Sequence, residues 1–180
     1  MKTKALTTKT MALCALFAAL TAVCAQITLP IGPVPISLSL LPVLLCAALM
    51  RPMQATVAML VYLFLGLAGL PVFSNLTGGA AKLFGVTGGY IIGYVPCAFV
   101  AAWLMTQWGK AFWRMAAAMA VGVLVCYAFG TAWFMLTKHM GLMQSLSLCV
   151  FPFLPGDAVK IVLAALLAGR LEKPLKSIVA

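Results

Sequence analysis

Long apolar runs alternate with short polar segments along the whole chain. A helix needs about 20 residues to cross a bilayer, so each apolar run predicts a membrane span. The six predicted spans are Thr10–Ile27, Ile36–Met50, Met53–Leu70, Thr87–Gln107, Met115–Leu136 and Pro155–Leu171. The second is short and contains Pro42, which predicts a bent helix lining a cavity. The pattern predicts an all-α integral membrane protein, a bundle of six transmembrane helices, with residues 1–180 as a single six-helix membrane domain.

Prolines and glycines mark the connections on one side of the predicted bundle. Residues 28–35 hold three prolines, which keep the chain out of a helix. Residues 71–86 form a long polar segment in which Gly78 and Gly79 permit a tight, close-fitting loop. This segment is either a functional loop or a simple connector. The third connection, 137–154, has an apolar second half that we expect to dip into the membrane interface.

Composition and charge favour a membrane protein with little mass outside the bilayer. The chain is 65% hydrophobic and 8% charged, against about 25% charged residues in soluble domains. The net charge of +10 does not indicate nucleic-acid binding, because the basic residues lie on alternate ends of successive spans. One side holds Lys2, Lys4, Lys9, Arg51, Lys110, Arg114, Arg170, Lys173 and Lys176, and the other holds only Lys82 and Lys138. The positive-inside rule then predicts that both termini are cytoplasmic.

The first span has two features with alternative interpretations. Its basic start and the small residues before Gln26 resemble a cleaved signal peptide, but cleavage would leave five spans and spoil the charge alternation. The patterns Ala15-x-x-x-Ala19 and Ala18-x-x-x-Ala22 let helices approach closely. They indicate packing within the bundle or contact with a partner helix.

The chain has only two acidic residues, and one of them opens a membrane span. Asp157 precedes an apolar run, and Lys160 lies three residues further on, on the same helix face. Each charge would cost roughly 2.5–3.5 kcal/mol at a bilayer centre. We therefore expect both to face protein or a polar cavity, either as part of a substrate site or as an ion pair that closes the helix start.

Polar groups gather in the half of the predicted bundle that lies away from the cytoplasm. They are Ser37, Ser39, Asn75, Thr77, Lys82, Tyr90, Asp157 and Lys160. An apolar pocket with a few convergent polar groups is typical of a small-molecule site. Asp157 would accept from ligand N–H groups, and Lys160 or Lys82 would meet a ligand anion. Tyr90 and its neighbour Tyr94 are either cavity walls or anchors at the membrane interface.

No sequence pattern indicates catalysis or a cofactor. Gly78-Gly79-Ala80-Ala81-Lys82 lacks the spacing of a nucleotide-binding loop. The only histidine, His139, has no partners for a catalytic triad, and the six cysteines form no C-x-x-C pair. The sequence therefore predicts a protein that is not an enzyme and carries no metal or cofactor.

Four sequence blocks resemble the BioY family, the biotin-specific S components of energy-coupling factor transporters. The blocks are GPVPISL at 32–38, YLFLGLAGLPVF at 62–73, GVTGGYIIG at 85–93 and PGDAVK at 155–160. The resemblance covers about residues 26–167 in the same order and spacing. It implies a six-helix bundle in the bacterial cytoplasmic (inner) membrane that binds biotin from outside with high affinity.

The resemblance also implies partners and site residues. The partners are a transmembrane coupling subunit and two cytoplasmic ATPases, and Ala15 and Ala19 match the family's coupling-subunit contact. The implied biotin-binding residues are Asp157, Lys160, Tyr90, Gly89, Asn75, Gly78, Gly79 and Lys82. The sequence departs from the family pattern at Ser39, where many members have glutamine, and at Asn75 and Leu76, where glycines are frequent.

Two other functions stay open at this point. One is an S component for another vitamin, such as thiamin or riboflavin. The other is a membrane scaffold that binds only partner helices, through the alanine face of the first span and Gly89-x-x-x-Gly93. A ligand panel separates the three hypotheses, because the scaffold predicts no saturable small ligand.

Overall fold

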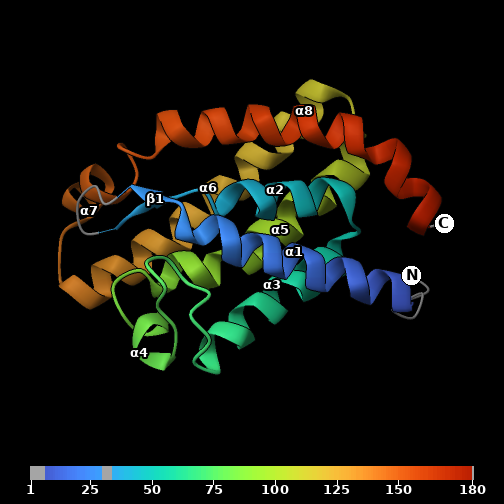
Figure 1. Cartoon of the computed structure of the whole chain (residues 1–180). Helices are drawn as coiled ribbons and strands as arrows, with labels where there is room; N and C mark the ends of the chain where they lie inside the picture. Colours follow the sequence, from blue (N-terminus) through green and yellow to red (C-terminus); the bar gives the residue numbers. More distant parts are fainter. Residues whose placement is uncertain (1–6, 30–33, 180) are drawn as a thin grey trace.

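The structure, a computed structural model, describes residues 7–29 and 34–179, with side chains described as far as Glu172. Within these residues the chain forms eight helices and one two-stranded hairpin. In chain order they are α1 (Thr8–Gln26), β1 (Thr28–Leu29), β2 (Ile36–Ser37), α2 (Leu40–Leu49), α3 (Pro52–Leu67), α4 (Ala80–Leu83), α5 (Gly88–Trp108), α6 (Phe112–Lys138), α7 (Leu142–Cys149) and α8 (Leu154–Val179). Figure 1 shows the start of α1 and the end of α8 at the same end of the molecule.

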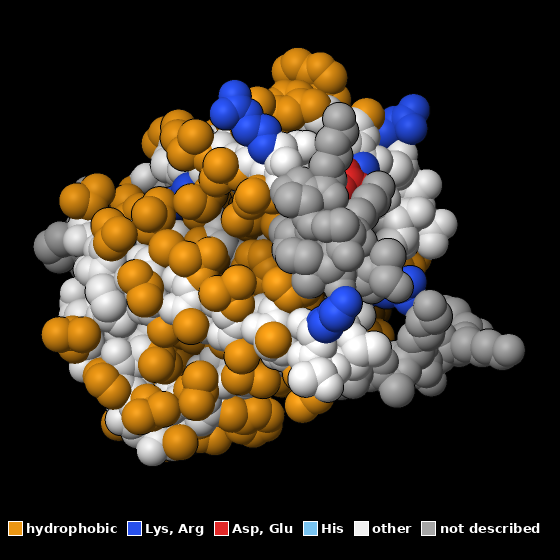
Figure 2. Space-filling model, turned by 45° about the vertical axis from the view of Figure 1, so that its right-hand side comes forward, with side chains coloured by type: hydrophobic (Ala, Val, Ile, Leu, Met, Phe, Trp, Pro, Cys, Tyr) orange, Lys and Arg blue, Asp and Glu red, His pale blue; other side chains and the backbone are white. Residues whose placement is uncertain are grey.

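The prediction of a helical membrane protein is confirmed in its main features. Among the described residues, α1, α5 and α6 are long and apolar enough to cross a membrane, and α7 with α8 form a pair bent by 54° that counts as a fourth span if taken together. The helices α2 and α3, of 10 and 16 residues, are also apolar but shorter. Hydrophobic side chains cover much of the surface in Figure 2, as expected for a surface that faces lipid.

The predicted second span, Ile36–Met50, is wrong in its first part. Ile36 and Ser37 are extended and pair antiparallel with Leu29 and Thr28, and the helix begins only at Leu40. In the hairpin, the backbone groups of Ile36 and Ser37 form hydrogen bonds with the other strand instead of with a further turn of helix. Pro42 does not bend α2, because it lies in the first turn, where a missing N–H costs little. Pro30 and Pro33 of the predicted first loop lie outside the described residues.

The predicted connection 137–154 is also wrong in part. The helix α6 continues to Lys138, and His139 ends it with a left-handed backbone conformation (φ 54°). Residues 142–149 of this connection form the helix α7, and the dip of its apolar second half into the membrane interface stays a prediction. Pro152 lies in the turn between α7 and α8, whereas Pro155 lies in the first turn of α8, where a missing N–H costs little.

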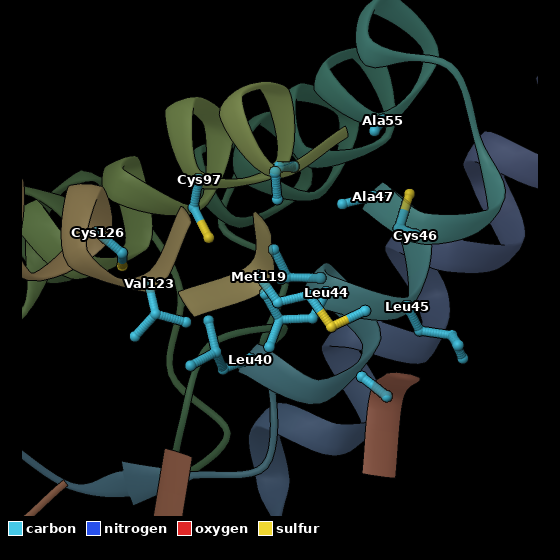
Figure 3. Close-up of a cluster of buried hydrophobic side chains, with 14 of the residues drawn as sticks. Leu40, Leu44, Leu45, Cys46, Ala47, Ala55, Cys97, Met119, Val123 and Cys126 are labelled. Carbon is cyan, nitrogen blue, oxygen red and sulfur yellow. The ribbon is translucent and has the colours of Figure 1, made fainter. Parts of the chain in front are cut away.

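The short helix α2 lies in the middle of the bundle. Val43, Leu44 and Cys46 are fully buried, and α2 packs against α1, α3, α5 and α8. Figure 3 shows Leu40 and Leu44 of α2 beside Val123 and Met119 of α6. A helix that is apolar on all sides belongs in the interior, so α2 can be short because its neighbours, rather than lipid, surround it.

Glycines allow α5 and α6 to pack closely. A Cβ on Gly89 would overlap Trp133, and one on Gly130 would overlap the ring of Tyr90. The predicted flat face Gly89-x-x-x-Gly93 is therefore a helix-packing surface, because Gly93 also faces α6, at Cys126. Because the two helices approach so closely, Tyr90 of α5 and side chains of α6 border the same space inside the bundle.

Candidate ligand-binding site

The buried ion pair predicted from the sequence is present at the start of α8. Lys160 Nζ lies 2.7 Å from Asp157 Oδ1, and the two residues are only 7% and 5% exposed. Lys160 also donates to the backbone oxygen of Ser37 at 2.7 Å, and the hydroxyl of Tyr127 donates to Asp157 Oδ2. The pair therefore joins α8 to α6 and to the hairpin strand β2.

Local helix geometry explains why these two side chains meet. Residues i and i+3 share a helix face, and the first turn of a helix favours a negative charge because its N–H groups are unpaired by the helix itself. The backbone N–H of Asp157 donates to Phe153 at 2.8 Å, which closes the turn at the start of α8. This turn fixes the backbone of Asp157, and Lys160 and Tyr127 hold its carboxylate.

A second polar network lies beside the ion pair. Ser37 Oγ and Ser39 Oγ are 2.5 Å apart, and Ser39 Oγ is 2.6 Å from the hydroxyl of Tyr94. The Tyr90 hydroxyl lies 3.3 Å from Thr131 Oγ1 and also donates to the Cys149 backbone oxygen at 3.4 Å. Both tyrosine hydroxyls thus have partners inside the bundle, so the structure favours cavity walls over interfacial anchors for these two residues.

Two adjoining cavities lie over these networks. The first, about 50 Å³, is lined by Val34, Pro35, Ser37, Leu40, Tyr90, Tyr94, Cys126, Tyr127, Cys149, Phe153, Asp157 and Lys160. The second, about 40 Å³, is lined by Val34, Pro35, Ser37, Ser74, Lys82, Thr87, Tyr90, Ile91 and Tyr94. Five residues line both, so the ion pair and Lys82 lie at opposite ends of one elongated, mainly apolar site.

The structure brings together four of the eight sequence-predicted binding residues. Asp157 and Lys160 line the first cavity, Lys82 lines the second, and Tyr90 lines both. Lys82 is half-buried, and its ammonium group makes no hydrogen bond or ion pair with any described residue. A lysine in that position has an ammonium group available for an anion.

The other four predicted binding residues line neither cavity. Asn75 accepts a 2.9 Å hydrogen bond from the Thr28 hydroxyl, and Gly89 faces Trp133. Gly78 packs on the backbone of Leu70, while Gly79 has a positive φ of 84° just before α4. Their positions shape the loop and the helix contact around the site.

The loop between α3 and α4 packs closely against the ends of α1 and α3. Phe73 is fully buried against Gly66, where any side chain would overlap its ring. Gln26, at the end of α1, donates to the Phe73 backbone oxygen at 3.2 Å and accepts from the Leu76 N–H at 2.8 Å. These contacts confirm the prediction of a close-fitting loop, and they place Ser74 and Lys82 at the second cavity.

Sequence reasoning missed several lining residues, above all Tyr127. This tyrosine lies in the middle of an apolar helix of 27 residues and is only 8% exposed. The sequence did carry a signal for this residue, a single tyrosine deep in an apolar span. A buried tyrosine hydroxyl needs a hydrogen-bond partner. Cys126 and Cys149 also line the cavity, but buried cysteines carry no comparable signal because they behave as small hydrophobes.

The two small-residue patterns of α1 face different ways. Ala18 is 1% exposed and Ala22 half-buried, so that pattern packs within the bundle. Ala15 and Ala19 are exposed and lie on the outer face of α1. A partner helix could therefore reach Ala15 and Ala19 without any rearrangement of the bundle.

These features define a class: a multi-pass helical membrane protein with internal, mainly apolar cavities that have charged side chains at their two ends. The model of the BioY family matches residues 1–177, and the chain belongs to that family. The biotin transporter BioY of Thermotoga maritima is 39% identical over 148 residues, which are 82% of this chain and 86% of that protein.

Two further comparisons agree. The probable biotin transporter BioY of Pyrococcus horikoshii is 37% identical over 164 residues, 91% of this chain and 96% of that protein. The fold matches a crystal structure of the S-component for biotin from an ECF-type ABC transporter with a TM-score of 0.85 and 29% identity. That match covers 92% of this chain and 91% of the other.

Proposed function

We propose that this protein binds biotin and takes it up across the bacterial cytoplasmic membrane as the S component of an energy-coupling factor transporter. The observation that carries this proposal is the buried Asp157–Lys160 pair at one end of a cavity, in a chain of the BioY family. The S component binds the vitamin and does not hydrolyse ATP, in keeping with the lack of a nucleotide-binding motif in the sequence.

The ureido group of biotin is assigned to the Asp157 end of the site. Each carboxylate oxygen can accept two hydrogen bonds, and each of those of Asp157 has one donor, from Lys160 or Tyr127. The carboxylate therefore has capacity left for ureido N–H donors. The Lys160 ammonium has three N–H donors, of which two reach Ser37 and Asp157, so it can also donate to the ureido oxygen.

The valeryl carboxylate of biotin is assigned to Lys82. The aromatic rings of Tyr90 and Tyr94 line both cavities and so lie between the two ends. They provide apolar walls for the ring sulfur and the aliphatic chain. Small-molecule sites usually enclose about 300–1,000 Å³, far more than the 50 and 40 Å³ of the two cavities, so biotin must widen the site as it binds.

We extend the proposal to the topology. The chain forms one domain over residues 1–180 with six membrane crossings, in which α2 and α3 count as two and α7 is part of the connection before α8. Both termini are cytoplasmic, which agrees with the start of α1 and the end of α8 lying at the same end of the molecule (Figure 1). Lys110, between α5 and α6, and Arg114, in the first turn of α6, lie on the side with most of the basic charge. Lys2 and Lys4, which contribute to that charge, lie outside the described residues.

The proposed partners are a transmembrane coupling subunit and two cytoplasmic ATPases. Ala15 and Ala19 are the proposed contact with the coupling subunit, because they are small, exposed and one helical turn apart on α1. Their size lets another helix approach α1 closely. Replacing Ala15 with leucine should impair uptake by the assembled transporter while leaving biotin binding by this chain intact.

Equilibrium binding of labelled biotin to the purified chain in detergent tests the proposal. We expect tight, saturable binding that unlabelled biotin displaces and that thiamin and riboflavin do not. Displacement by one of the other vitamins would support an S component of different specificity. A folded, monodisperse sample that binds none of them would instead support a scaffold that contacts only partner helices.

A further inference from the structure

A third cavity lies between α6 and α7, on the side of Tyr127 away from the ion pair. It encloses about 340 Å³, several times the volume of either cavity of the biotin site. Ala128 and Ala132 of α6 lie one turn apart and leave the space open, while Leu142 and Leu146 of α7 form the opposite side. The cavity is thus a groove that exists because two exposed positions on α6 are small.

The groove presents almost no polar atoms to its contents. Tyr127 and Thr131 belong to its lining, but the hydroxyl of Tyr127 donates to Asp157 and that of Thr131 is paired with Tyr90 at 3.3 Å. The other lining side chains are aliphatic or Met135. A groove of this kind suits a hydrocarbon chain and offers nothing to a polar ligand.

The groove faces the membrane. It runs along α6, which is long and apolar enough to span a bilayer, and its edges at Leu124 and Leu142 are 61% and 57% exposed. The lining residues Met135 and Leu142 lead to the turn between α6 and α7. One end of the groove therefore opens where the α6 helix ends.

Positive charge is concentrated at that end. Lys138 is exposed in the last turn of α6, and its ammonium group makes no hydrogen bond or ion pair with any described residue. The N-terminus of α7, whose first N–H groups lack helical partners, begins four residues later at Leu142. An ammonium group and a helix N-terminus together favour a phosphate.

We propose that the α6–α7 groove binds one membrane phospholipid, with an acyl chain against Ala128 and Ala132 and its phosphate at Lys138. Tyr127 separates the groove from the cavity that holds Asp157. The lipid would therefore support the wall of the biotin site from its other side. A transmembrane helix is a poorer occupant. A helix with its side chains is about 10–12 Å wide, and the leucines of α7 narrow the groove.

Native mass spectrometry of the full chain tests this proposal. The protein is reconstituted in vesicles of phosphatidylethanolamine and phosphatidylglycerol, extracted again in a mild detergent, and the retained phospholipids are counted. We expect one phospholipid per wild-type chain and a several-fold lower occupancy for Ala132→Phe, whose ring fills the groove. Ala117→Phe, a matched change at an exposed alanine of α6 outside the groove, should retain the lipid.

Four results would overturn the proposal or part of it. A wild-type chain that retains no phospholipid removes the site, as does equal retention by Ala132→Phe and wild type. A dimer that Ala132→Phe abolishes without changing lipid retention would assign the groove to a second copy of the chain. Lys138→Gln should lower retention, and unchanged retention would remove the phosphate contact. Ala128→Phe repeats the test at a second position if Ala132→Phe does not fold.

Discussion

The only two acidic residues of the chain make two ion pairs near opposite ends of α8, and the pairs differ in burial. Asp157 and Lys160 are 2.7 Å apart, with side chains 6% and 9% exposed. Glu172 and Lys110 are 3.3 Å apart, with side chains 21% and 36% exposed. Each lysine also donates to a backbone oxygen, Lys160 to Ser37 at 2.7 Å and Lys110 to Ala48 at 2.9 Å.

The two ion pairs make similar contacts but differ in what they contribute to the protein. An exposed ion pair contributes about 0–1 kcal/mol, because water solvates both charges when they separate. A buried pair has a high desolvation cost and leaves an uncompensated charge when one partner is removed. The Lys110 pair fastens α8 to the end of α2 and the α5–α6 turn, whereas the Asp157 pair holds charge inside the bundle beside a cavity. Charge in that position serves a ligand better than it serves stability.

Replacing Lys160 with methionine should have the largest effect on stability. The change leaves Asp157 buried without its cation, and breaking a buried pair costs roughly 3–5 kcal/mol. Thermal unfolding in detergent, followed by circular dichroism, would show a clear fall in the midpoint. The double variant Asp157→Asn with Lys160→Met should recover part of the loss, and a double variant less stable than Lys160→Met alone would contradict this account.

Replacing Lys82 with glutamine should weaken biotin binding about 10-fold, or roughly 1.4 kcal/mol, because one charge-assisted contact with the biotin carboxylate is lost. Biotinamide, which lacks that charge, serves as the control ligand. We expect the wild type to bind biotinamide more weakly than biotin, and Lys82→Gln to bind the two alike. A variant that still prefers biotin over its amide would move the carboxylate away from Lys82.

Replacing Tyr127 with phenylalanine should weaken biotin binding about threefold to tenfold, since it deletes one hydrogen bond to the Asp157 carboxylate. The ring, which separates the biotin site from the α6–α7 groove, stays in place. Isothermal titration calorimetry with biotin measures the change. Tyr62→Phe, which removes a hydroxyl bonded to the Val72 backbone at 3.2 Å outside the cavities, is the matched control and should bind as the wild type does.

Replacing Glu172 with glutamine should have the smallest effect, at most about 1 kcal/mol in stability and none on biotin affinity. The residue lies in a half-exposed pair far along α8 from Asp157. Raising the ionic strength should reduce even this difference, because salt screens exposed charges. A large loss of biotin binding in Glu172→Gln would contradict the contrast between the two pairs.

The sequence predicts the chemistry of the site better than its shape. Asp157 and Lys160 could be found because charges are rare in apolar runs and their spacing places them on one helix face. Tyr127 could not be assigned to them, since its contact with Asp157 depends on how α6 and α8 pack. Asn75, Gly78, Gly79 and Gly89 were predicted as ligand contacts, but the structure places them in loop geometry and helix packing around the cavity.

The fold shows the same division between local and long-range signals. Hydropathy located α1, α3, α5, α6 and the start of α8 to within a few residues, because each is a continuous apolar run. The end of α8 was missed, because the helix continues through the polar residues after Leu171 to Val179. The start of α2 was misplaced because residues 36–37 pair with residues 28–29, and strand pairing is not visible in a local pattern. The helix α7 was taken for a connection because eight residues between two turns are too few to show a clear period.

The most direct test of the central claim is biotin affinity in Asp157→Asn, measured beside Glu172→Gln in detergent at one ionic strength. The asparagine keeps the size of the side chain but loses the charge and half of the acceptor capacity, so we expect biotin binding to weaken by about 10–100-fold, or roughly 1.5–3 kcal/mol. Glu172→Gln should bind as the wild type does. Equal affinity in a folded Asp157→Asn protein would show that the buried ion pair is a structural feature of the bundle and that biotin binds elsewhere.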